Sequence, residues 1–298
     1  MSKKKGNKPS AKAARAAHRP KLFSTPGECI KCMKKSVYLI ARGRNIDEDN
    51  PDRLNFVTIG SACVVAPNKM ITAAHVINNP NAPSPLATHA DSDSYYLIRH
   101  DDENNWHAAI VQLTLDTNLF IYPDLDLAII YLPDSFYEGN QQVFALKDDY
   151  IRIDPNFRTI GTDVAVLGYP LCVLNFEEEQ LDKPMVGNIL LRADAGIINC
   201  RFRTASEIAK YQFTMPFNPG NSGGPIFNWR NGQLLSIVQG YDAIAVNIKE
   251  QPLNAEQKQD LGIEDYTEDS FIDVIHAIYS NGFATHSFVN AFKEHNIL

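Results

Sequence analysis

Apolar and polar residues alternate in short runs along most of the chain from residue 36 onward, and this period of two is typical of strands that bury one face. Turn residues such as Pro67 and Asn68 separate the runs. The candidate strands lie at 36–41, 55–66, 70–72, 95–99, 106–113, 127–132, 163–167, 189–192, 195–200, 226–228 and 234–239. About eleven short strands of this kind predict an all-β fold, as in sandwiches and barrels.

The hydrophobic period changes near the C-terminus. Apolar residues recur there at helical spacing, at Phe271, Val274, Ile275 and Ile278. We expect this helix to begin after a Thr267 cap and to end at Asn281-Gly282. We expect a second short helix after Thr285, with Phe288 and Phe292 buried. The pattern therefore predicts C-terminal helices packed on the β fold.

The length and composition fit a globular protein, because 298 residues with 44% apolar side chains can bury a large core. No apolar run approaches the roughly 18 residues that cross a bilayer, and the polar N-terminus lacks the apolar region of a signal peptide. Five cysteines, an odd number, fit a reducing compartment. We therefore expect a cytoplasmic protein that does not bind membranes.

Charge is distributed unevenly along the chain. Residues 1–21 hold eight Lys and Arg and no acid. The remaining residues hold 20 basic groups against 35 acidic ones, a net charge of −15, whereas the whole chain has −7. Because it has few bulky apolar side chains, the segment 1–30 is predicted to be a disordered basic tail. A solubilising arm is favoured over a tether to nucleic acid.

Three separated motifs carry candidate chemistry. The glycine-rich segment 218–225 places Ser222 where backbone amides can surround its hydroxyl. A serine hydroxyl needs a base to become a nucleophile near neutral pH, and His75 is the candidate base. A carboxylate must orient the imidazole, and Asp126, directly before an apolar run, is favoured for this role. Asp124, two residues earlier, is the alternative.

The same motifs predict a site for the oxyanion of a tetrahedral intermediate. Gly220 allows the backbone to turn its N–H groups toward one point, so the N–H groups of Gly220 and Ser222 are the expected donors. The candidate base, acid and nucleophile are separated by 51 and 96 residues. Their joint occurrence in this order predicts a Ser-His-Asp triad.

At these motifs the chain resembles the chymotrypsin-like, or trypsin-fold, serine peptidases, and especially their HtrA (Deg) branch. The resemblance covers residues 36–245 and implies two antiparallel six-stranded β-barrels with an active site in the cleft between them. It rests on the segments 60–67, 72–76, 124–128, 161–170, 195–198 and 218–225.

The resemblance also implies a division of the chain. The basic tail at 1–30 precedes a peptidase domain at 31–250, whose two barrels meet near 135–160. A helical segment at 251–298 is expected to pack on the barrels. This last segment is shorter than the PDZ domain of typical HtrA proteins, so we expect no PDZ domain.

In this family the primary specificity pocket lies between the residues that precede the nucleophile loop and the strand that follows it. Carried over by position, the substrate-binding residues are Met215, Pro216, Phe217, Val238, Gln239, Gly240 and Tyr241. Pro216 stands where trypsin has an acid, so we expect small or medium apolar P1 residues rather than Lys or Arg. Asn221 replaces the aspartate that receives a new N-terminus in digestive relatives, so activation by N-terminal cleavage is not expected.

The remaining cysteines and histidines indicate no further site. Cys29 and Cys32 have the spacing of half a zinc site, but no second pair completes the four ligands, so ordinary thiols are favoured and no metal is expected. Histidines such as His286 and His295 lack ligand spacing and are expected to be polar residues of the surface or of a helix face.

These patterns together predict a serine endopeptidase that cleaves a protein or peptide substrate through an acyl-enzyme on Ser222 and uses no cofactor. The alternative is a catalytically silent trypsin-fold binding module. An unrestrained peptidase would damage a cell, so narrow specificity, an active-site loop or a regulatory partner protein is expected to control the activity.

Overall fold

The computed structural model places most of the β-rich part of the chain. The described residues are 22–45, 54–77, 93–100, 106–111, 118–132, 135–138, 141–144, 150–170, 191–247 and 273–298. The basic stretch 1–21, Cys172, and the predicted cap Thr267 with Phe271 lie outside them.

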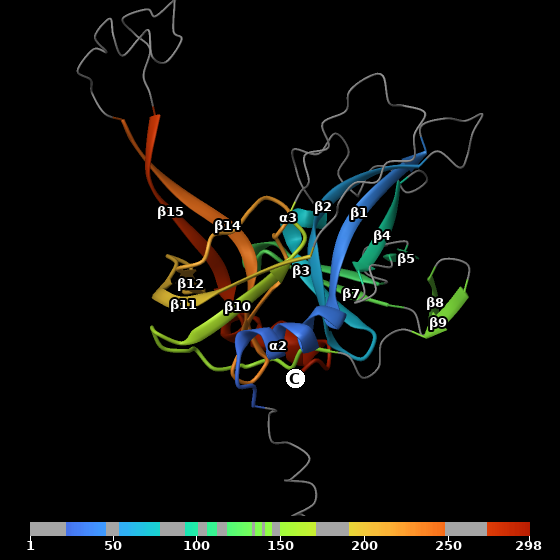
Figure 1. Cartoon of the computed structure of the whole chain (residues 1–298), viewed down its shortest axis with the longest axis horizontal. Helices are drawn as coiled ribbons and strands as arrows, with labels where there is room; N and C mark the ends of the chain where they lie inside the picture. Colours follow the sequence, from blue (N-terminus) through green and yellow to red (C-terminus); the bar gives the residue numbers. More distant parts are fainter. Residues whose placement is uncertain are drawn as a thin grey trace, which may run out of the picture.

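The N-terminal half forms an antiparallel seven-stranded sheet with the strand order β5-β4-β1-β2-β3-β7-β6 (Figure 1). Its strands are β1 (Val37–Asn45), β2 (Leu54–Ala66), β3 (Lys69–Ala73), β4 (Asp93–His100), β5 (Trp106–Val111), β6 (Leu119–Tyr122) and β7 (Leu127–Tyr131). The β-branched and apolar residues of β3 and β7 are buried almost throughout, because these two strands pair at the centre of the core. A two-stranded sheet of β8 (Ser135–Glu138) and β9 (Gln141–Phe144) follows.

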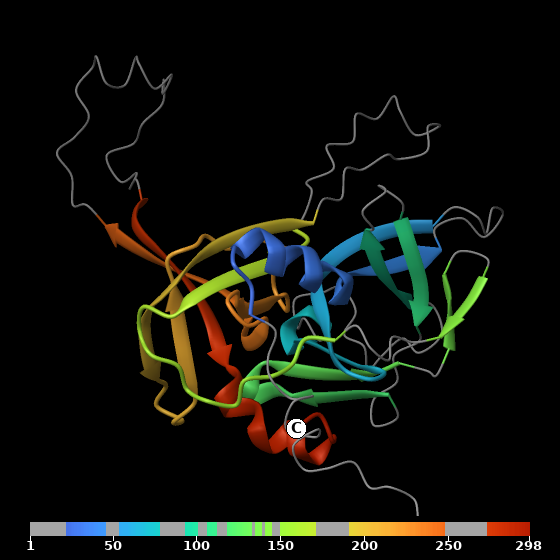
Figure 2. The ribbon, with the colours of Figure 1, turned by 60° about the horizontal axis from the view of Figure 1, so that its bottom comes forward.

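The C-terminal half closes into a barrel with the strand order β10-β11-β12-β15-β14-β13 (Figure 2). Each strand of this barrel therefore pairs with two neighbours. Its strands are β10 (Asp163–Gly168), β11 (Arg192–Arg203), β12 (Ala209–Phe213), β13 (Pro225–Asn228), β14 (Gln233–Asn247) and β15 (Asp273–Ala284). In β12, buried and half-buried residues alternate, as the period of two requires. The predicted all-β fold is therefore confirmed.

The first predicted C-terminal helix is wrong, because Asp273–Ala284 is the strand β15. β15 lies between β12 and β14 and completes the barrel, so pairing with distant strands overrides the local helical spacing. The predicted helix end lies inside this strand. A Cβ at Gly282 would lie 2.5 Å from the carbonyl oxygen of Ile237, so glycine here permits close approach of two backbones.

The second predicted C-terminal helix is confirmed. A 3-10 turn, η5 (Thr285–Phe288), leads into α5 (Val289–Glu294). Phe288 and Phe292 are fully buried, and their ring centroids lie 5.6 Å apart. The chain thus ends in a short helix anchored by two aromatic side chains.

The predicted disordered tail of residues 1–30 extends too far toward the C-terminus. The helix α2 (Pro26–Met33) begins after Thr25, whose hydroxyl accepts from Glu28 N–H at 3.3 Å, and a 3-10 turn, η1 (Lys34–Ser36), follows. The Phe23 N–H donates to the carbonyl of Arg230 at 2.9 Å, so this segment is tied to the second barrel. The Thr-Pro-Gly-Glu sequence of this helix start resembles a capping box, a signal that the charge pattern obscured.

The thiols of α2 do not take part in a metal site among the residues that the structure describes. Cys29 is fully buried and Cys32 is half-buried. Within the described ranges, no three His, Cys, Asp or Glu side chains lie together as metal ligands do. The described helices are all too short or too polar to cross a bilayer.

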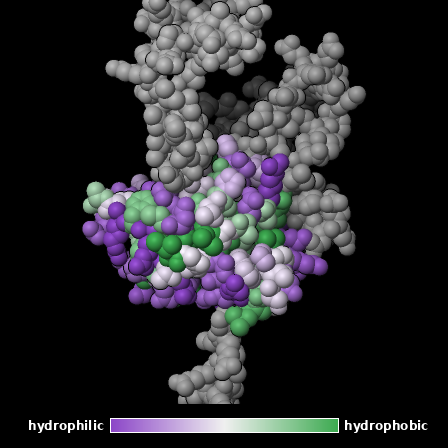
Figure 3. All heavy atoms as spheres, turned by 60° about the vertical axis from the view of Figure 1, so that its left-hand side comes forward, coloured by the Kyte–Doolittle hydropathy of each residue, from purple (hydrophilic) through white to green (hydrophobic). Residues whose placement is uncertain are grey.

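The outer face of the second barrel is mostly polar, with a small group of apolar residues among the polar ones (Figure 3). Ile160 and Ile197 are 58% and 38% exposed. The chain around them is joined by hydrogen bonds from Gly161 N–H to Ile198 O and from Ile198 N–H to Thr162 O. Single exposed apolar residues of this kind are common on protein surfaces.

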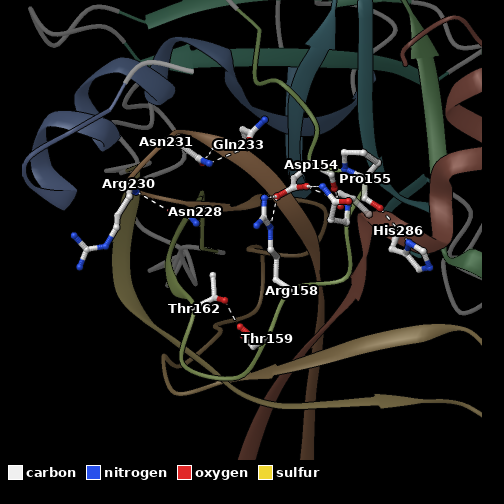
Figure 4. Close-up of polar contacts among 12 residues, drawn as sticks. Asp154, Pro155, Arg158, Thr159, Thr162, Asn228, Arg230, Asn231, Gln233 and His286 are labelled. Carbon is white, nitrogen blue, oxygen red and sulfur yellow. Dashed lines mark hydrogen bonds and ion pairs between the residues drawn. The ribbon is translucent and has the colours of Figure 1, made fainter. Parts of the chain in front are cut away.

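The connector at 150–162 links the two halves. Ile151 N–H donates to Val64 O in the first sheet, and Asp154 N–H donates to Leu234 O in the second barrel, both at 2.9 Å. The Asp154 carboxylate is buried and pairs with the Arg158 guanidinium (Figure 4). Thr285 donates its hydroxyl proton to Asp154 O at 2.5 Å. The connector therefore fixes the two halves and the C-terminal segment to one another.

Candidate active site

His75 and Asp126 come together at the end of the first sheet. β3 ends at Ala73, and the single helical turn α3 (Ala74–Ile77) directs the His75 side chain outward. A 3-10 turn, η3 (Pro123–Leu125), joins β6 to β7 and places Asp126 after it with φ 46°. Because β3 pairs with β7, the two ends that carry these residues are neighbours.

Several hydrogen bonds hold the carboxylate against the imidazole. His75 Nδ1 lies 2.8 Å from Asp126 Oδ2 and 3.0 Å from Oδ1. The His75 backbone N–H also donates to Oδ1 at 2.9 Å, and Ala74 N–H donates to Asp126 O at 3.0 Å. Nδ1 is therefore the protonated nitrogen of the neutral ring, and Nε2 remains an acceptor. The side chains of His75 and Asp126 are 42% and 15% exposed, whereas Asp124 is exposed.

Ser222 lies in a tight loop before β13. Asn221 N–H donates to Asn218 O at 3.0 Å, and Gly224 N–H donates to Asn221 O at 2.8 Å. Gly223 N–H donates to Val238 O at 2.7 Å, which ties the loop to β14. Gly220 and Gly223 have φ 91° and 80°, conformations that only glycine adopts without strain. This explains the glycines on either side of Ser222.

The loop that holds Ser222 packs directly against the segment that holds His75. A Cβ at Gly60 would lie 2.6 Å from Val76 Cγ2 and 2.9 Å from Ser222 O, so glycine permits these groups to meet. A Cβ at Gly223 would clash with Thr72 Oγ1 and lie 2.8 Å from Ala73 N. The structure therefore brings together the three segments that hold His75, Asp126 and Ser222.

Ser61 joins the first sheet to this loop. Its N–H donates to Ser222 O at 2.8 Å, and its hydroxyl donates to Gly220 O, also at 2.8 Å. The same hydroxyl accepts from Tyr169 N–H at 2.8 Å, while Ser61 O accepts from the Thr72 hydroxyl at 2.6 Å. Ser61 is fully buried. The role of Ser61 could not be predicted from the sequence, because a serine inside a strand pattern has no local feature that marks it.

The Ser222 hydroxyl is directed toward β14. It donates to the carbonyl oxygen of Gln239 at 3.4 Å, and no hydrogen bond joins it to His75 in the described part of the chain. Two members of the predicted triad are hydrogen-bonded to each other, and the third lies in the loop packed beside them.

Within the described ranges, two backbone N–H groups at the Ser222 loop have no acceptor. Among the described residues, Asn221 and Gly223 donate their N–H groups to carbonyl oxygens, but Gly220 and Ser222 do not. The N–H of Ser222 itself and the N–H two residues before it are thus free to donate to an oxyanion, as the donors of an oxyanion hole do.

The predicted substrate-binding residues differ in exposure. Met215, Phe217 and Val238 are at most 4% exposed and belong to the apolar core of the barrel, whereas Pro216 is exposed. Gln239, Gly240 and Tyr241 follow in β14; the first two are half-buried, and the Tyr241 side chain lies outside the described residues. Among the described residues, no atom lies within 4 Å of a Cβ at Gly240, so the sheet face is uncovered at this residue.

β15 contributes to this region as well. Phe217 N–H donates to the Ser280 hydroxyl at 3.1 Å, and Asn281 pairs with Gly240 across the ladder. Ser280 is thus a further candidate for the wall beside the nucleophile. The place of Ser280 beside the nucleophile loop was not expected, because the helical spacing of its segment predicts a helix rather than a strand.

A model of the trypsin-like peptidase domain matches residues 60–237, which is more than half of the chain. The chain belongs to this family. The matched range contains His75, Asp126 and Ser222. No curated protein matches the chain. As a trypsin-like peptidase domain, the protein belongs with proteases in general, and its fold agrees with this assignment.

Proposed function

We propose that this trypsin-like peptidase is a serine endopeptidase with the triad His75, Asp126 and Ser222. The observation that carries the proposal is the hydrogen-bonded pair of His75 and Asp126, packed against the glycine-rich loop of Ser222. A binding surface alone does not require an imidazole with its tautomer set by a carboxylate.

The proposed reaction begins when Ser222 Oγ attacks the carbonyl carbon of the scissile peptide bond. His75 Nε2 takes the hydroxyl proton, and the Asp126 carboxylate stabilises the imidazolium. The oxyanion accepts hydrogen bonds from the N–H groups of Gly220 and Ser222. The intermediate collapses when His75 gives its proton to the leaving amine. Water then hydrolyses the acyl-enzyme by the same route in reverse, without a cofactor.

The substrate is proposed to be an extended protein or peptide segment that lies along β14. The Gln239 carbonyl and the Gly240 backbone would pair with the substrate backbone, as in other cases of strand addition, because the ladder of β14 with β13 ends at Ile237. Small or medium apolar side chains are the proposed P1 residues, since Pro216 supplies no acid to pair with Lys or Arg. The similarity of 218–225 to the nucleophile loop of the HtrA branch supports a relationship to that branch.

A second candidate function is a trypsin-fold binding module that does not catalyse hydrolysis. The hydrogen bond from the Ser222 hydroxyl to the Gln239 carbonyl favours it, because a serine in this position does not share its proton with His75. In this case the open part of β14 would bind a peptide without cleaving it.

Labelling with a fluorescent fluorophosphonate, which reacts with activated serines, distinguishes the two functions. We expect the folded wild-type protein to be labelled, the Ser222→Ala variant to be unlabelled, and the control Ser206→Ala, at an exposed turn, to be labelled like the wild type. Circular dichroism establishes that each variant is folded. A folded wild-type protein that remains unlabelled would support the binding module.

A further inference from the structure

The imidazole of His295 joins the C-terminal end of the chain to the first sheet. His295 follows α5 and is only 5% exposed. Its Nε2 lies 2.7 Å from the hydroxyl of Tyr122, at the end of β6, and its Nδ1 lies 2.9 Å from the hydroxyl of Tyr131, at the end of β7. Figure 2 shows the red C-terminal helix against the green strands of this hairpin. The expectation that His295 is a surface or helix-face residue is therefore wrong.

The partners of the two tyrosines define the direction of the hydrogen bonds. Tyr122 donates its hydroxyl proton to Glu294 Oε2 at 2.9 Å, so it accepts from Nε2–H of His295. Burial lowers the pKa of His295 and so favours the neutral ring, in which Nδ1 is unprotonated and accepts from the Tyr131 hydroxyl. Burial and, to a smaller extent, the nearby Glu294 raise the pKa of Tyr122 to about 12. The phenol of Tyr122 therefore stays protonated. His295 is thus neutral, with both nitrogens in use.

Apolar and charged contacts reinforce this connection. The His295 ring lies 4.6 Å from the ring of Phe120 between the centroids, and 5.7 Å from that of Tyr131. Lys69 Nζ donates to Asn296 O at 3.2 Å from the start of β3. The C-terminal segment therefore contacts β3, β6 and β7, the three strands whose connections carry His75 and Asp126.

Tyr122, which contacts His295, flanks the same turn as the candidate catalytic carboxylate of Asp126. Tyr122 immediately precedes the 3-10 turn η3, and Asp126 immediately follows it. Asp126 N–H closes the turn by donating to Pro123 O at 3.0 Å, and Tyr122 pairs with Leu127 across the ladder. Asp126 has a left-handed backbone, which L-residues adopt at a cost, so the turn depends on contacts that hold its ends.

We propose that His295 is a positioning residue for the Asp126 carboxylate and acts through the hydroxyl of Tyr122. The inference rests on the proposed peptidase function. His295 touches no reacting atom; it holds the start of the turn that ends at Asp126. A loss of this contact frees the turn and misplaces the carboxylate against His75, while the substrate side of the site, at β14, is unaffected.

Two substitutions at position 295 separate this role from simple packing. The amide nitrogen of a Gln side chain reaches the place of Nε2, and the amide oxygen of Asn reaches the place of Nδ1. His295→Gln therefore keeps the bond to Tyr122, whereas His295→Asn keeps only the bond to Tyr131. Tyr122→Phe removes the hydroxyl alone and preserves the ring.

The test measures fluorophosphonate labelling of the full chain over a range of probe concentrations. We expect His295→Asn and Tyr122→Phe to lower the limiting rate of labelling by about tenfold, with the half-saturating probe concentration unchanged within about twofold. His295→Gln retains most of the wild-type rate. The matched control is His286→Gln, because His286 is exposed, bonds to Pro155 O, and lies outside the catalytic and binding machinery.

The outcomes distinguish failure of this inference from failure of the proposed function. Equal loss of rate in the Gln and Asn variants shows a packing role and overturns the inference, as does a wild-type rate in Tyr122→Phe. Absence of labelling in the folded wild-type protein overturns the peptidase function itself. Thermal unfolding establishes that each variant is folded at the assay temperature, and Tyr122→Phe tests the same contact if a substitution at 295 prevents folding.

Discussion

At the scale of single residues, Asp126 and Asp124 show how burial assigns a role to one of two neighbouring carboxylates. Asp126 accepts hydrogen bonds from the ring and the backbone of His75, whereas the Asp124 side chain is exposed. A carboxylate that bonds to Nδ1 holds the imidazole in the tautomer that can accept a proton at Nε2. The two residues therefore provide a matched pair for mutation.

We expect Asp126→Asn to lower the rate of fluorophosphonate labelling at neutral pH by roughly a thousandfold or more, because an amide favours the wrong tautomer of His75. Asp124→Asn should retain the wild-type rate within about twofold, since an exposed carboxylate that does not bond to His75 contributes little to the stability of the imidazolium. A larger loss in Asp124→Asn than in Asp126→Asn would show that the carboxylate has been assigned to the wrong residue.

A comparison of Gly223 with Gly161 distinguishes two costs of replacing glycine, the strain of a positive φ and the steric clash of a Cβ. Both have a positive φ, 80° and 83°, but a Cβ at Gly223 would clash with Thr72 Oγ1, while one at Gly161 would meet no atom within 4 Å. We expect Gly223→Ala to lower the free energy of unfolding by about 3 kcal/mol and Gly161→Ala by about 1 kcal/mol, measured by urea denaturation. Equal losses would mean that the loop can move away from Thr72.

At the scale of elements, the hairpin of β6 and β7 and the end of α5 form one unit. The His295 ring is enclosed by Tyr122, Tyr131 and Phe120, with Glu294 and Lys69 as the nearby charges. Burial lowers the pKa of His295, because the charged imidazolium is poorly solvated there; Glu294 opposes this shift and Lys69 adds to it. His295 therefore contributes to stability in its neutral form.

The lowered pKa sets the direction of a pH effect. The unfolded chain binds a proton at position 295 at a higher pH than the folded chain, so the stabilisation by His295 is complete above about pH 6.5 and is lost as the pH falls through the folded pKa. Urea denaturation should show a steeper loss of stability below about pH 6.5 in the wild type than in His295→Gln. Parallel curves for the two proteins would contradict this assignment.

At the scale of the whole molecule, the candidate site depends on contacts between the first sheet and the second barrel. Ser61 provides the closest connection, since its hydroxyl bonds to both Gly220 O and Tyr169 N–H. Ser236 offers a comparison inside the barrel, because it is equally buried and donates to Phe283 O at 2.6 Å. The two serines differ mainly in whether they contact the nucleophile loop.

We expect Ser61→Ala and Ser236→Ala each to lower the free energy of unfolding by about 1–3 kcal/mol, because each leaves a buried polar group without its partner. Only Ser61→Ala should also slow fluorophosphonate labelling, by about tenfold, since the loop around Ser222 loses its anchor. Thermal unfolding and labelling are measured on the same samples. A similar loss of labelling in both variants would show that the effect follows stability alone.

The sequence pattern predicted much of the fold where local and tertiary preferences agree. The alternating runs at 55–66, 163–167 and 226–228 correspond to β2, β10 and β13, because each strand is buried on one face or on both. The run that became β15 was predicted to be a helix, since its apolar spacing is helical and its pairing partners are distant in the sequence. The first part of α2, up to residue 30, is included in the predicted tail because it follows directly on the basic stretch 1–21.

The sequence by itself determined the residue types and order of the candidate chemistry, His75, then Asp126 or its alternative Asp124, then Ser222, because a glycine-rich loop, a base and a carboxylate are each marked by their immediate neighbours. Only the tertiary structure decided that Asp126 rather than Asp124 meets the imidazole, that Ser61 anchors the loop, and that His295 lies between two tyrosines. These contacts join residues far apart in the chain, which only the folding of the sheets brings together. A local sequence pattern therefore cannot predict them.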